Sequence, residues 1–202
     1  MTPTRIGLFI VAYFLGSIPT GYWLGQAWKG IDIRKHGSGN VGATNVYRVL
    51  GPVPALFTFC VDCVKGLVPV ILAQRLFPGE LSTAALAGIS AIVGHTLSVF
   101  VRFHGGKGMA TATGVFAGLL PIPALVAFTV FITITIATRY VSLGSLIGAL
   151  TLVACSFLLS APRSLAWTSA AVAVFAFWTH RANIQRLLHG TENRMTWKSK
   201  TS

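Results

Sequence analysis

Long apolar runs alternate with short polar and basic segments along the whole chain. Runs such as "IGLFIVAYFLG", "LSTAALAGISAIVG" and "LVAFTVFITITIA" each cover most of a membrane span, which needs roughly 20 residues. The pattern predicts candidate membrane spans at Ile6–Trp28, Pro52–Phe77, Leu81–Val101, Met109–Leu120, Pro123–Thr138, Val141–Ser160 and Leu165–Trp178. We therefore expect an all-α fold, a polytopic integral membrane bundle that forms a single domain over residues 1–202, with residues 196–202 as a frayed tail.

One part of this pattern, Met109–Thr138, is interrupted by "PIP". It could form one kinked span or two short ones, and two prolines in three residues favour a break. Three polar, basic loops, "KGIDIRKHGSGN", "RFHGGKG" and "HRANIQRLLHGTENR", lie between the runs. If all three share one side, an even number of spans must separate the second loop from the third, so the segment must hold two. The prediction is about seven spans, with the N-terminus outside and the C-terminus in the cytoplasm. A five-span alternative with merged or re-entrant segments keeps the same sidedness, and Met109–Leu120 could be a half-helix.

The basic residues follow the same division. On the predicted inner side are Lys29, Arg34, Lys35, Arg48, Arg102, Lys107, Arg139, Arg181, Arg186, Arg194, Lys198 and Lys200. Only Arg5, Arg75 and Arg163 are outside, and Lys65 is within a span. This asymmetry is the positive-inside bias of membrane proteins. The net charge is +12, but the chain is 53% hydrophobic and only 10% charged, against about 25% charged in soluble domains. The excess therefore indicates anionic headgroups rather than nucleic acid.

Metal and redox chemistry are poorly supported by the sequence. The three cysteines, Cys60, Cys63 and Cys155, all lie in apolar runs, where we expect small, packed side chains. The four acidic residues are scattered without the spacing of metal ligands. We expect no metal and no cofactor.

The first loop has the composition of a phosphate-binding turn. "GSGNVG" at residues 37–42 fits G-x-G-x-x-G, and the continuation to Thr44 nearly fits a P-loop, except that Ala43 stands where a lysine is required. Both nucleotide folds need a preceding strand, whereas this loop follows a predicted transmembrane helix. Backbone N–H groups in such a turn can still surround one anion, and Arg48 can bind it with two hydrogen bonds. The expected phosphate-binding residues are Gly37, Ser38, Gly39, Asn40, Gly42, Ala43, Thr44 and Asn45. The plain alternative is a tight interhelical turn.

Two further loops support anion binding. Gly105, Gly106 and Gly108 surround Lys107 just before a predicted helix, and the N-terminus of a helix attracts phosphate. The third loop carries His180 and Asn183, which share one helix face if the helix continues there. Three loops with glycines or cations and few acids suggest more than one phosphate group.

Several ionisable groups fall inside or next to predicted spans. Asp62 and Lys65 are three residues apart and should pair, because a lone charge in lipid is costly. His95 ends the third span, where an interhelical hydrogen bond is the plain expectation. Glu192 is the only acid of the third loop and is expected to orient a neighbouring arginine.

The sequence also limits the possible reactions. The G-x-S-x-G elbow of serine hydrolases is absent, and none of the five histidines has an aspartate five residues later. The second pattern resembles the signature of the common glycerolipid acyltransferases. An enzyme with these residues must work with anion-binding groups and at most one histidine, which suits a donor that already carries a good leaving group. Acyl phosphate is such a donor.

Five segments resemble, in order and along nearly the whole chain, the bacterial acyl-phosphate:glycerol-3-phosphate acyltransferases, the PlsY family. They are "LGSIPTGYWLG", "GSGNVGATNVYR", "DCVKG", "GHTLSVFVRFHGGKGMATATG" and "HRANIQRLLHGTE". The sequence departs from the family at Val41 and Ser98, where proline is usual, and at His104, where lysine is common.

The resemblance implies an enzyme of the bacterial inner membrane, with its active site at the cytoplasmic face. It would transfer a fatty acyl chain from acyl phosphate to the sn-1 hydroxyl of glycerol 3-phosphate, giving lysophosphatidic acid. The family uses neither acyl-CoA nor acyl carrier protein as donor. Carried over by motif position, the functional residues are Ser38, Arg48, Lys107, His180 and Asn183. Substrates and membrane lipid are the expected partners, with no obligate protein partner.

Two rival functions from other classes stay open at this point. A transporter of phosphorylated anions also needs half-helices and basic loops, but it binds near the membrane midplane. A non-catalytic protein that binds anionic lipid would need only the basic loops. The general base, His180 or a substrate phosphate oxygen, is also left open.

Overall fold

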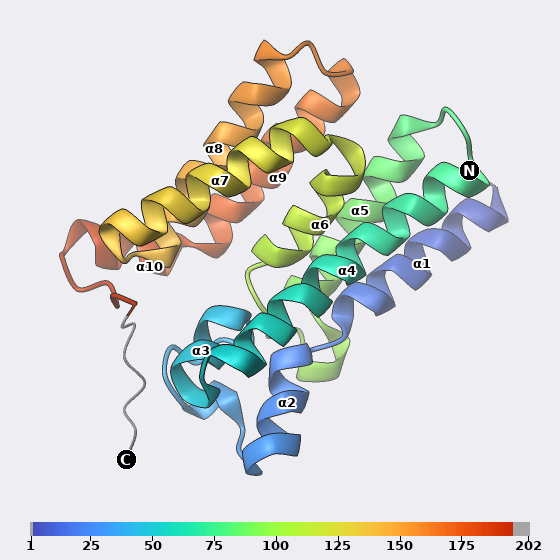
Figure 1. Cartoon of the computed structure of the whole chain (residues 1–202). Helices are drawn as coiled ribbons and strands as arrows, with labels where there is room; N and C mark the ends of the chain where they lie inside the picture. The colour runs from blue at the N-terminus through green and yellow to red at the C-terminus, as the bar shows by residue number, and fades with distance from the viewer. Residues whose placement is uncertain (1, 196–202) are drawn as a thin grey trace. The chain divides into compact units, whose positions relative to one another are not determined.

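The structure is a computed structural model that describes residues 2–195, so the predicted tail at residues 196–202 lies outside the described residues. The described residues form ten α-helices and two short 3-10 helices, without a β-strand among them, and this confirms the all-α prediction (Figure 1). The chain divides into two compact units, Met1–Leu119 and Leu120–Ser202. The single-domain organisation stays a prediction, and each unit is described by itself.

Unit 1 is built around α1 (Pro3–Ser17), α4 (Pro52–Leu76), α5 (Leu81–Thr96) and α6 (Met109–Leu119). Helix α1 packs on α5, and α4 packs on both α5 and α6. Glycines allow these helices to approach closely, because a Cβ atom on Gly16 would overlap the Ala91 carbonyl and one on Gly114 would overlap the Cys63 carbonyl. Small residues at helix contacts are typical of packing in membranes.

Helix α4 turns apolar side chains outward and polar ones inward. Val53 is 70% exposed and Leu56 is 65% exposed, whereas Asp62 and Lys65 are only 2% and 5% exposed. Apolar side chains exposed in this way along a helix are unfavourable in water and favourable in lipid. Five helical segments of the described chain are long and apolar enough to cross a membrane: Pro3–Lys29, Pro52–Leu76, Leu81–Val101, Pro121–Thr138 and Val141–Leu158. Helix α6 is apolar but has only 11 residues, about half of a span, so the count of seven spans and their orientation stay predictions.

The first predicted span, Ile6–Trp28, lies within the apolar helical segment Pro3–Lys29, but the helix is interrupted inside it. Helix α1 ends at Ser17, and α2 (Thr20–Lys29) begins after Pro19. Proline has no N–H group to donate into the helix and it restricts the residue before it. The prediction missed this break because the apolar pattern continues across it. The predicted break at "PIP" is confirmed, since α6 ends at Leu119 and α7 (Pro121–Thr138) begins at Pro121.

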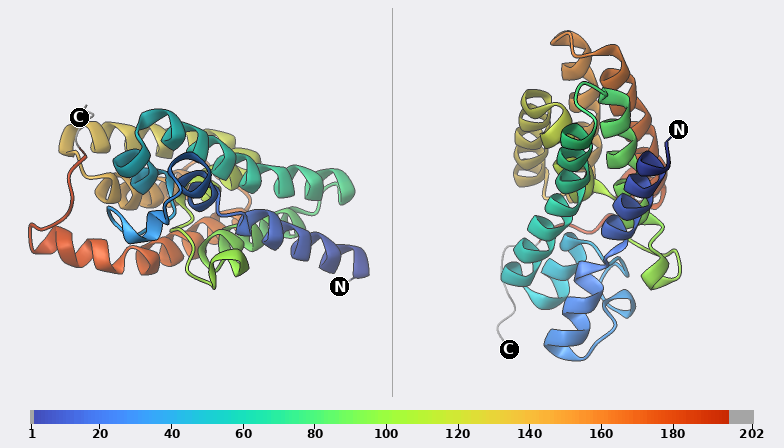
Figure 2. Two further views of the ribbon diagram at one scale, coloured as in Figure 1. Left: turned by 90° about the horizontal axis from the view of Figure 1, so that it is seen from below. Right: turned by 90° about the vertical axis from the view of Figure 1, so that its right-hand side faces the viewer.

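The first two polar loops lie at the same end of unit 1. The first loop contains η1 (Ile33–Lys35) and leads into α3 (Ala43–Leu50), which contacts α2 and α4. Figure 2 shows α2 and α3 grouped at this end. The second loop contains η2 (Val99–Val101) and is attached to the end of α1, because the Ser98 hydroxyl donates to the Ser17 carbonyl. At the opposite end, Arg5 pairs with Glu80 at 2.6 Å.

Unit 2 consists of α7, α8 (Val141–Leu158), α9 (Arg163–Thr179) and the short α10 (Arg181–Leu188). Helix α8 packs against both α7 and α9, and α10 contacts α8 and α9. The chain after α10 returns to the α7–α8 turn, where the Met195 N–H donates to the Arg139 carbonyl at 2.7 Å. This return holds the third polar loop against the helix ends of its own unit.

Candidate active site

The first loop opens a helix, which the sequence analysis did not predict. Gly42 is the N-cap residue of α3, so Ala43, Thr44, Asn45 and Arg48 are helical residues instead of parts of a loop. The first N–H groups of a helix have no acceptor within it. The turn at residues 37–42 therefore leads into the positive end of a short helix, an arrangement that favours anions. The N–H groups of Ser38, Gly39 and Gly42 donate within the loop.

Asn45 organises this loop from inside. Its Oδ1 accepts from the Ser38 N–H at 2.7 Å, and its Nδ2 lies within hydrogen-bond distance of the carbonyl oxygens of Ile33, His36 and Asn40 at 3.1, 3.1 and 2.8 Å. The residue is only 1% exposed. Gly37 has a φ of 60° and lies so close to Asn45 that a Cβ atom would overlap Oδ1. In the structure the polar atoms of the Asn45 side chain hydrogen-bond within the loop, and direct binding of phosphate by Asn45 stays a prediction.

Asp32 and Arg34 fix the entry into the loop. Arg34 donates to Asp32 from Nε at 2.9 Å and from a terminal nitrogen at 2.8 Å. These hydrogen bonds lower the pKa of Asp32 from 3.8 to about 2, and Asp32 in turn raises the pKa of Arg34. The Arg34 guanidinium also lies 4.7 Å from the centre of the Tyr22 ring. Arg34 is therefore committed to the loop structure, and Arg48 is the arginine best placed by sequence for a substrate phosphate.

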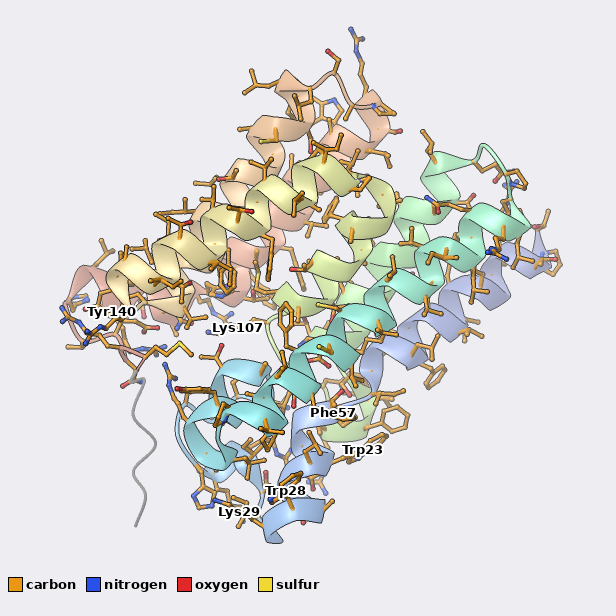
Figure 3. The ribbon with its side chains drawn as sticks, viewed as in Figure 1. Trp23, Trp28, Lys29, Phe57, Lys107 and Tyr140 are labelled. Carbon is orange, nitrogen blue, oxygen red and sulfur yellow. The ribbon has the colours of Figure 1, made fainter. Side chains whose placement is uncertain are left out.

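The second loop folds back onto the end of α5. The N–H groups of Gly105 and Gly106 donate to the carbonyl oxygens of Thr96 and His95, each at 3.0 Å. Gly108 has a φ of 80°, and its carbonyl accepts from Ala112 in the first turn of α6 at 2.7 Å. The prediction that this loop leads directly into a helix is confirmed. Figure 3 shows Lys107 on the loop at the start of α6, so one cation stands beside the positive end of a helix.

His180 lies between α9 and α10 and is 2% exposed. Its Nδ1 lies 2.8 Å from the carbonyl oxygen of Ala176. A carbonyl can only accept, so Nδ1 is the donor in this contact, and in the corresponding neutral tautomer Nε2 is the nitrogen with the lone pair. The structure thus defines which nitrogen can accept a proton.

Glu192 holds the third loop together. Its Oε1 accepts from Asn183 Nδ2 at 2.6 Å and from the Ser142 hydroxyl at 2.8 Å, and its Oε2 accepts from Arg186 Nε at 2.7 Å. Burial opposes the ionised form, but these three hydrogen bonds outweigh it and lower the pKa of Glu192 below its usual value of 4.5. The prediction that Glu192 orients an arginine is confirmed. Because the carboxylate fixes Asn183 Nδ2, it also fixes the direction of the Asn183 amide oxygen.

The structure brings the predicted residues together in two groups. Ser38, Arg48 and Lys107 lie at the end of unit 1 that carries both loops, and His180 and Asn183 lie within one helical turn in unit 2. Sequence reasoning missed Ser142, which lies 50 residues from its partner Glu192. No local pattern marks a contact over such a separation.

The fold and these loops define a class: an all-helical integral membrane protein whose helix ends carry glycine-rich, cationic loops suited to phosphate groups. The family model described as "Glycerol-3-phosphate acyltransferase" matches residues 6–190, and the chain belongs to this family. A glycerol-3-phosphate acyltransferase of Desulforamulus reducens is 44% identical over 195 residues, covering 96% of this chain and 97% of the relative. One of Geobacter sulfurreducens is 47% identical over 187 residues, covering 93% of this chain and 95% of the relative.

Two solved structures are similar over the same length. Both are crystal structures of PlsY (YgiH), an integral membrane glycerol 3-phosphate acyltransferase, one in the glycerol 3-phosphate form and one in the lysophosphatidic acid form. Each is 37% identical to this chain and covers 96% of both chains, with TM-scores of 0.91 and 0.89. The recognition made from the sequence motifs is confirmed at the level of the family.

Proposed function

We propose that this protein transfers a fatty acyl group from acyl phosphate to the sn-1 hydroxyl of glycerol 3-phosphate, releasing lysophosphatidic acid and inorganic phosphate. The observation that carries the proposal is the pair of glycine-rich loops at one end of unit 1, each of which leads into a helix N-terminus. Two such sites suit a reaction in which both substrates carry a phosphate group. The relative solved with glycerol 3-phosphate and with lysophosphatidic acid supports the acceptor and the product.

In the proposed reaction, the glycerol hydroxyl oxygen attacks the acyl carbon, and the bond from this carbon to the phosphate oxygen breaks. Arg48 and Lys107 neutralise phosphate charge and stabilise the transition state electrostatically. The glycines at 37, 39, 42, 105, 106 and 108 are proposed to let the backbone come close to the phosphate groups, while the N–H groups of Gly39, Gly42, Gly105 and Gly106 donate within the protein and hold the turns in shape. Inorganic phosphate is a good leaving group, so the step requires no covalent acyl-enzyme. Ser38 acts as a hydrogen-bond donor.

His180 and Asn183 are proposed to orient the glycerol hydroxyl. His180 Nδ1 donates to the Ala176 carbonyl, so Nε2 is the ring atom proposed to accept the hydroxyl proton. The leaving phosphate oxygen is the other possible acceptor. The two are distinguished by the pH dependence of kcat/KM: turnover in His180→Gln with an unchanged pH profile would assign the proton to the phosphate, whereas loss of a wild-type titration together with activity would assign it to His180.

The arrangement of the loops favours an enzyme over a transporter of phosphorylated anions. Transporters bind their substrates near the midplane, at interrupted helices, whereas both loops of unit 1 follow helix ends. The basic residues predicted on one side of the membrane support an inner-membrane location with the site at the cytoplasmic face. We infer that both units contribute to one transmembrane acyltransferase domain.

The experiment compares donors. Purified protein is incubated with labelled glycerol 3-phosphate and either palmitoyl phosphate or palmitoyl-CoA, and lysophosphatidic acid is measured. We expect product only with palmitoyl phosphate. Turnover with palmitoyl-CoA alone would overturn the donor, and uptake of glycerol 3-phosphate into vesicles without acylation would support the transporter.

A further inference from the structure

A buried cluster of ionisable residues in unit 1 lies next to the second loop, and the proposed reaction assigns it no role. It consists of Asp62 and Lys65 on α4 and His95 on α5. We propose that His95 is a positioning residue: Gly105 and Gly106 pack directly on it, and this contact, the seat of the second loop, holds the loop in place. Asp62 and Lys65 hold His95 from the side away from the loop. The inference rests on the proposed function insofar as the second loop holds a substrate phosphate.

The contact between His95 and the loop is close on both the backbone and the ring. The Gly106 N–H donates to the His95 carbonyl at 3.0 Å. A Cβ atom on Gly106 would overlap Nε2 of the imidazole and would lie 2.9 Å from Cε1 and 3.0 Å from Cδ2. A Cβ atom on Gly105 would overlap the His95 carbonyl. The loop therefore rests on His95 without intervening space, and the next residue along the chain is Lys107.

Asp62 supports the other side of the imidazole. Its Oδ2 lies 3.9 Å from His95 Nδ1, which is within ion-pair range and beyond hydrogen-bond distance. Its Oδ1 accepts from Lys65 Nζ at 2.8 Å and from the Thr20 hydroxyl at 3.0 Å. Asp62, Lys65 and His95 are all at least 94% buried. The carboxylate is thus held by α2 and α4 while it faces a ring on α5.

Lys65 extends the cluster to the break in the first helix. Its Nζ also donates to the carbonyl of Ile18 at 2.8 Å, directly before Pro19. Thr20, which begins α2, donates to the same carboxylate as Lys65. One ion pair therefore ties together the α1–α2 break and the residue beneath the second loop.

The costs of such a cluster favour a positioning role over simple helix attachment. Charged groups within a membrane protein are expensive and tend to serve function, and a buried ion pair can often be replaced by apolar residues without loss of stability. Glycine contacts already join α1 to α5 and α4 to α6. The ion pair acts at other places, because it links α4 to the α1–α2 break and faces the imidazole on α5. Its position beside the residue that contacts the second loop favours the positioning role.

The direct test is a double-mutant cycle between Gly106→Ala and His95→Ala. The added methyl group clashes with the imidazole, and removal of the imidazole makes room for it. We expect kcat/KM to fall roughly 100-fold in Gly106→Ala and about 10-fold in His95→Ala, with the double variant no worse than about 100-fold, since neighbouring residues in contact are strongly coupled. Independent effects would multiply to about 1,000-fold, and that result would overturn the proposal.

A second measurement separates positioning from folding. His95→Gln should raise KM for one phosphate substrate at least about threefold and leave the other KM unchanged. A merely structural role would lower the active fraction, and hence kcat, without changing either KM, and this outcome would also overturn the proposal. Thr83→Val is the matched control, because Thr83 is a buried polar residue on α5 whose hydroxyl bonds Glu80 at the far end; both KM values should stay at the wild-type level.

The bracing by Asp62 and Lys65 is tested with the neutral pair Asp62→Asn/Lys65→Met. We expect this variant to insert and melt like the wild type, because no unpaired charge remains, and to raise the same KM as His95→Gln by about threefold or more. A wild-type KM would reduce the pair to a structural role. If the wild type itself turns over only with palmitoyl-CoA, the proposed donor fails, and the same variants measured with that donor still test the seat.

Discussion

Two side chains organise polar loops in this molecule, and they do so in opposite ways. In unit 1, the neutral amide of Asn45 mainly donates, because three backbone carbonyls of the first loop point at its nitrogen. In unit 2, the carboxylate of Glu192 only accepts, from an amide, a hydroxyl and a guanidinium. The partners determine the residue type. Three carbonyls require a donor, which the amide nitrogen supplies, and three donors require an acceptor-only group, which the carboxylate supplies. The hydrogen bonds of Asn45 therefore do not depend on ionisation, while those of Glu192 depend on an ionised group.

Neither Asn45 nor Glu192 is proposed to take part in catalysis, whereas Lys107 is. The loss of Lys107 should therefore have the largest effect and gives the scale for the others. Lys107→Ala should lower kcat/KM roughly 100- to 1,000-fold, because a preorganised cation opposite developing charge is lost, with the melting temperature and membrane insertion unchanged. Steady-state kinetics measure this. Lys29→Ala is the matched control, since Lys29 is an exposed lysine at the same end of unit 1 that donates to the Val49 carbonyl. Near-normal turnover in Lys107→Ala would remove the role assigned to Lys107.

The next largest effect should come from Asn45→Asp, which keeps the shape and reverses the hydrogen bonding. A carboxylate oxygen would face the carbonyls of Ile33, His36 and Asn40, so we expect the loop to shift and kcat/KM to fall about 100-fold. Gln74→Glu makes the same amide-to-acid change at an exposed side chain that donates to the Gly118 carbonyl, and its activity should be normal. If Asn45→Asp were as active as Gln74→Glu, the loop would not depend on this amide.

Glu192→Gln should have a smaller effect that depends on pH. At pH 7 we expect about a tenfold loss of kcat/KM and a melting temperature lower by roughly 3–6 °C, because one donor of the new amide must face other donors. The folded pKa of Glu192 is lowered, so its contribution to stability is fully present above the unfolded pKa and is lost as the pH falls through the folded value. The difference in melting temperature between wild type and variant should thus be constant above about pH 5 and narrow below pH 4.5. A gap that widened in acid would contradict the assignment.

Asp32→Asn should have the smallest effect. The pair with Arg34 is partly exposed, with 18% and 32% of the two side chains accessible, and such pairs contribute little to stability. We expect less than a twofold change in kcat/KM and a melting temperature lower by about 1–2 °C. A loss as large as that of Asn45→Asp would show that the entry to the first loop matters as much as its centre.

Features that depend on residues close together in sequence were predictable. The apolar runs predicted most helices, the spacing of Asp62 and Lys65 predicted their pairing, and "PIP" predicted a helix break. These are local signals, in which the residues that interact are neighbours in sequence. The motifs also predicted the family, since the quoted segments lie in order along the chain.

Contacts between distant segments were not predictable in this way. The hydrogen bonds of Asn45 within the loop were not predicted, because their partners, the carbonyls of Ile33, His36 and Asn40, carry no signature in their side chains. Ser142 was missed because it reaches Glu192 across 50 residues. The break at Pro19 was missed because the flanking residues stay apolar, and Lys65 satisfies the Ile18 carbonyl from another helix.

The central claim is direct transfer from acyl phosphate, and a rapid-quench experiment tests it most directly. Enzyme at a concentration comparable to that of the donor is mixed with palmitoyl phosphate, first without and then with glycerol 3-phosphate. The amounts of inorganic phosphate and lysophosphatidic acid are measured in each case. We predict no phosphate release until glycerol 3-phosphate is present, and then equal amounts of phosphate and lysophosphatidic acid. A burst of phosphate equal to the enzyme concentration in the absence of acceptor, with an acyl group retained on the protein at Ser38 or elsewhere, would contradict the account.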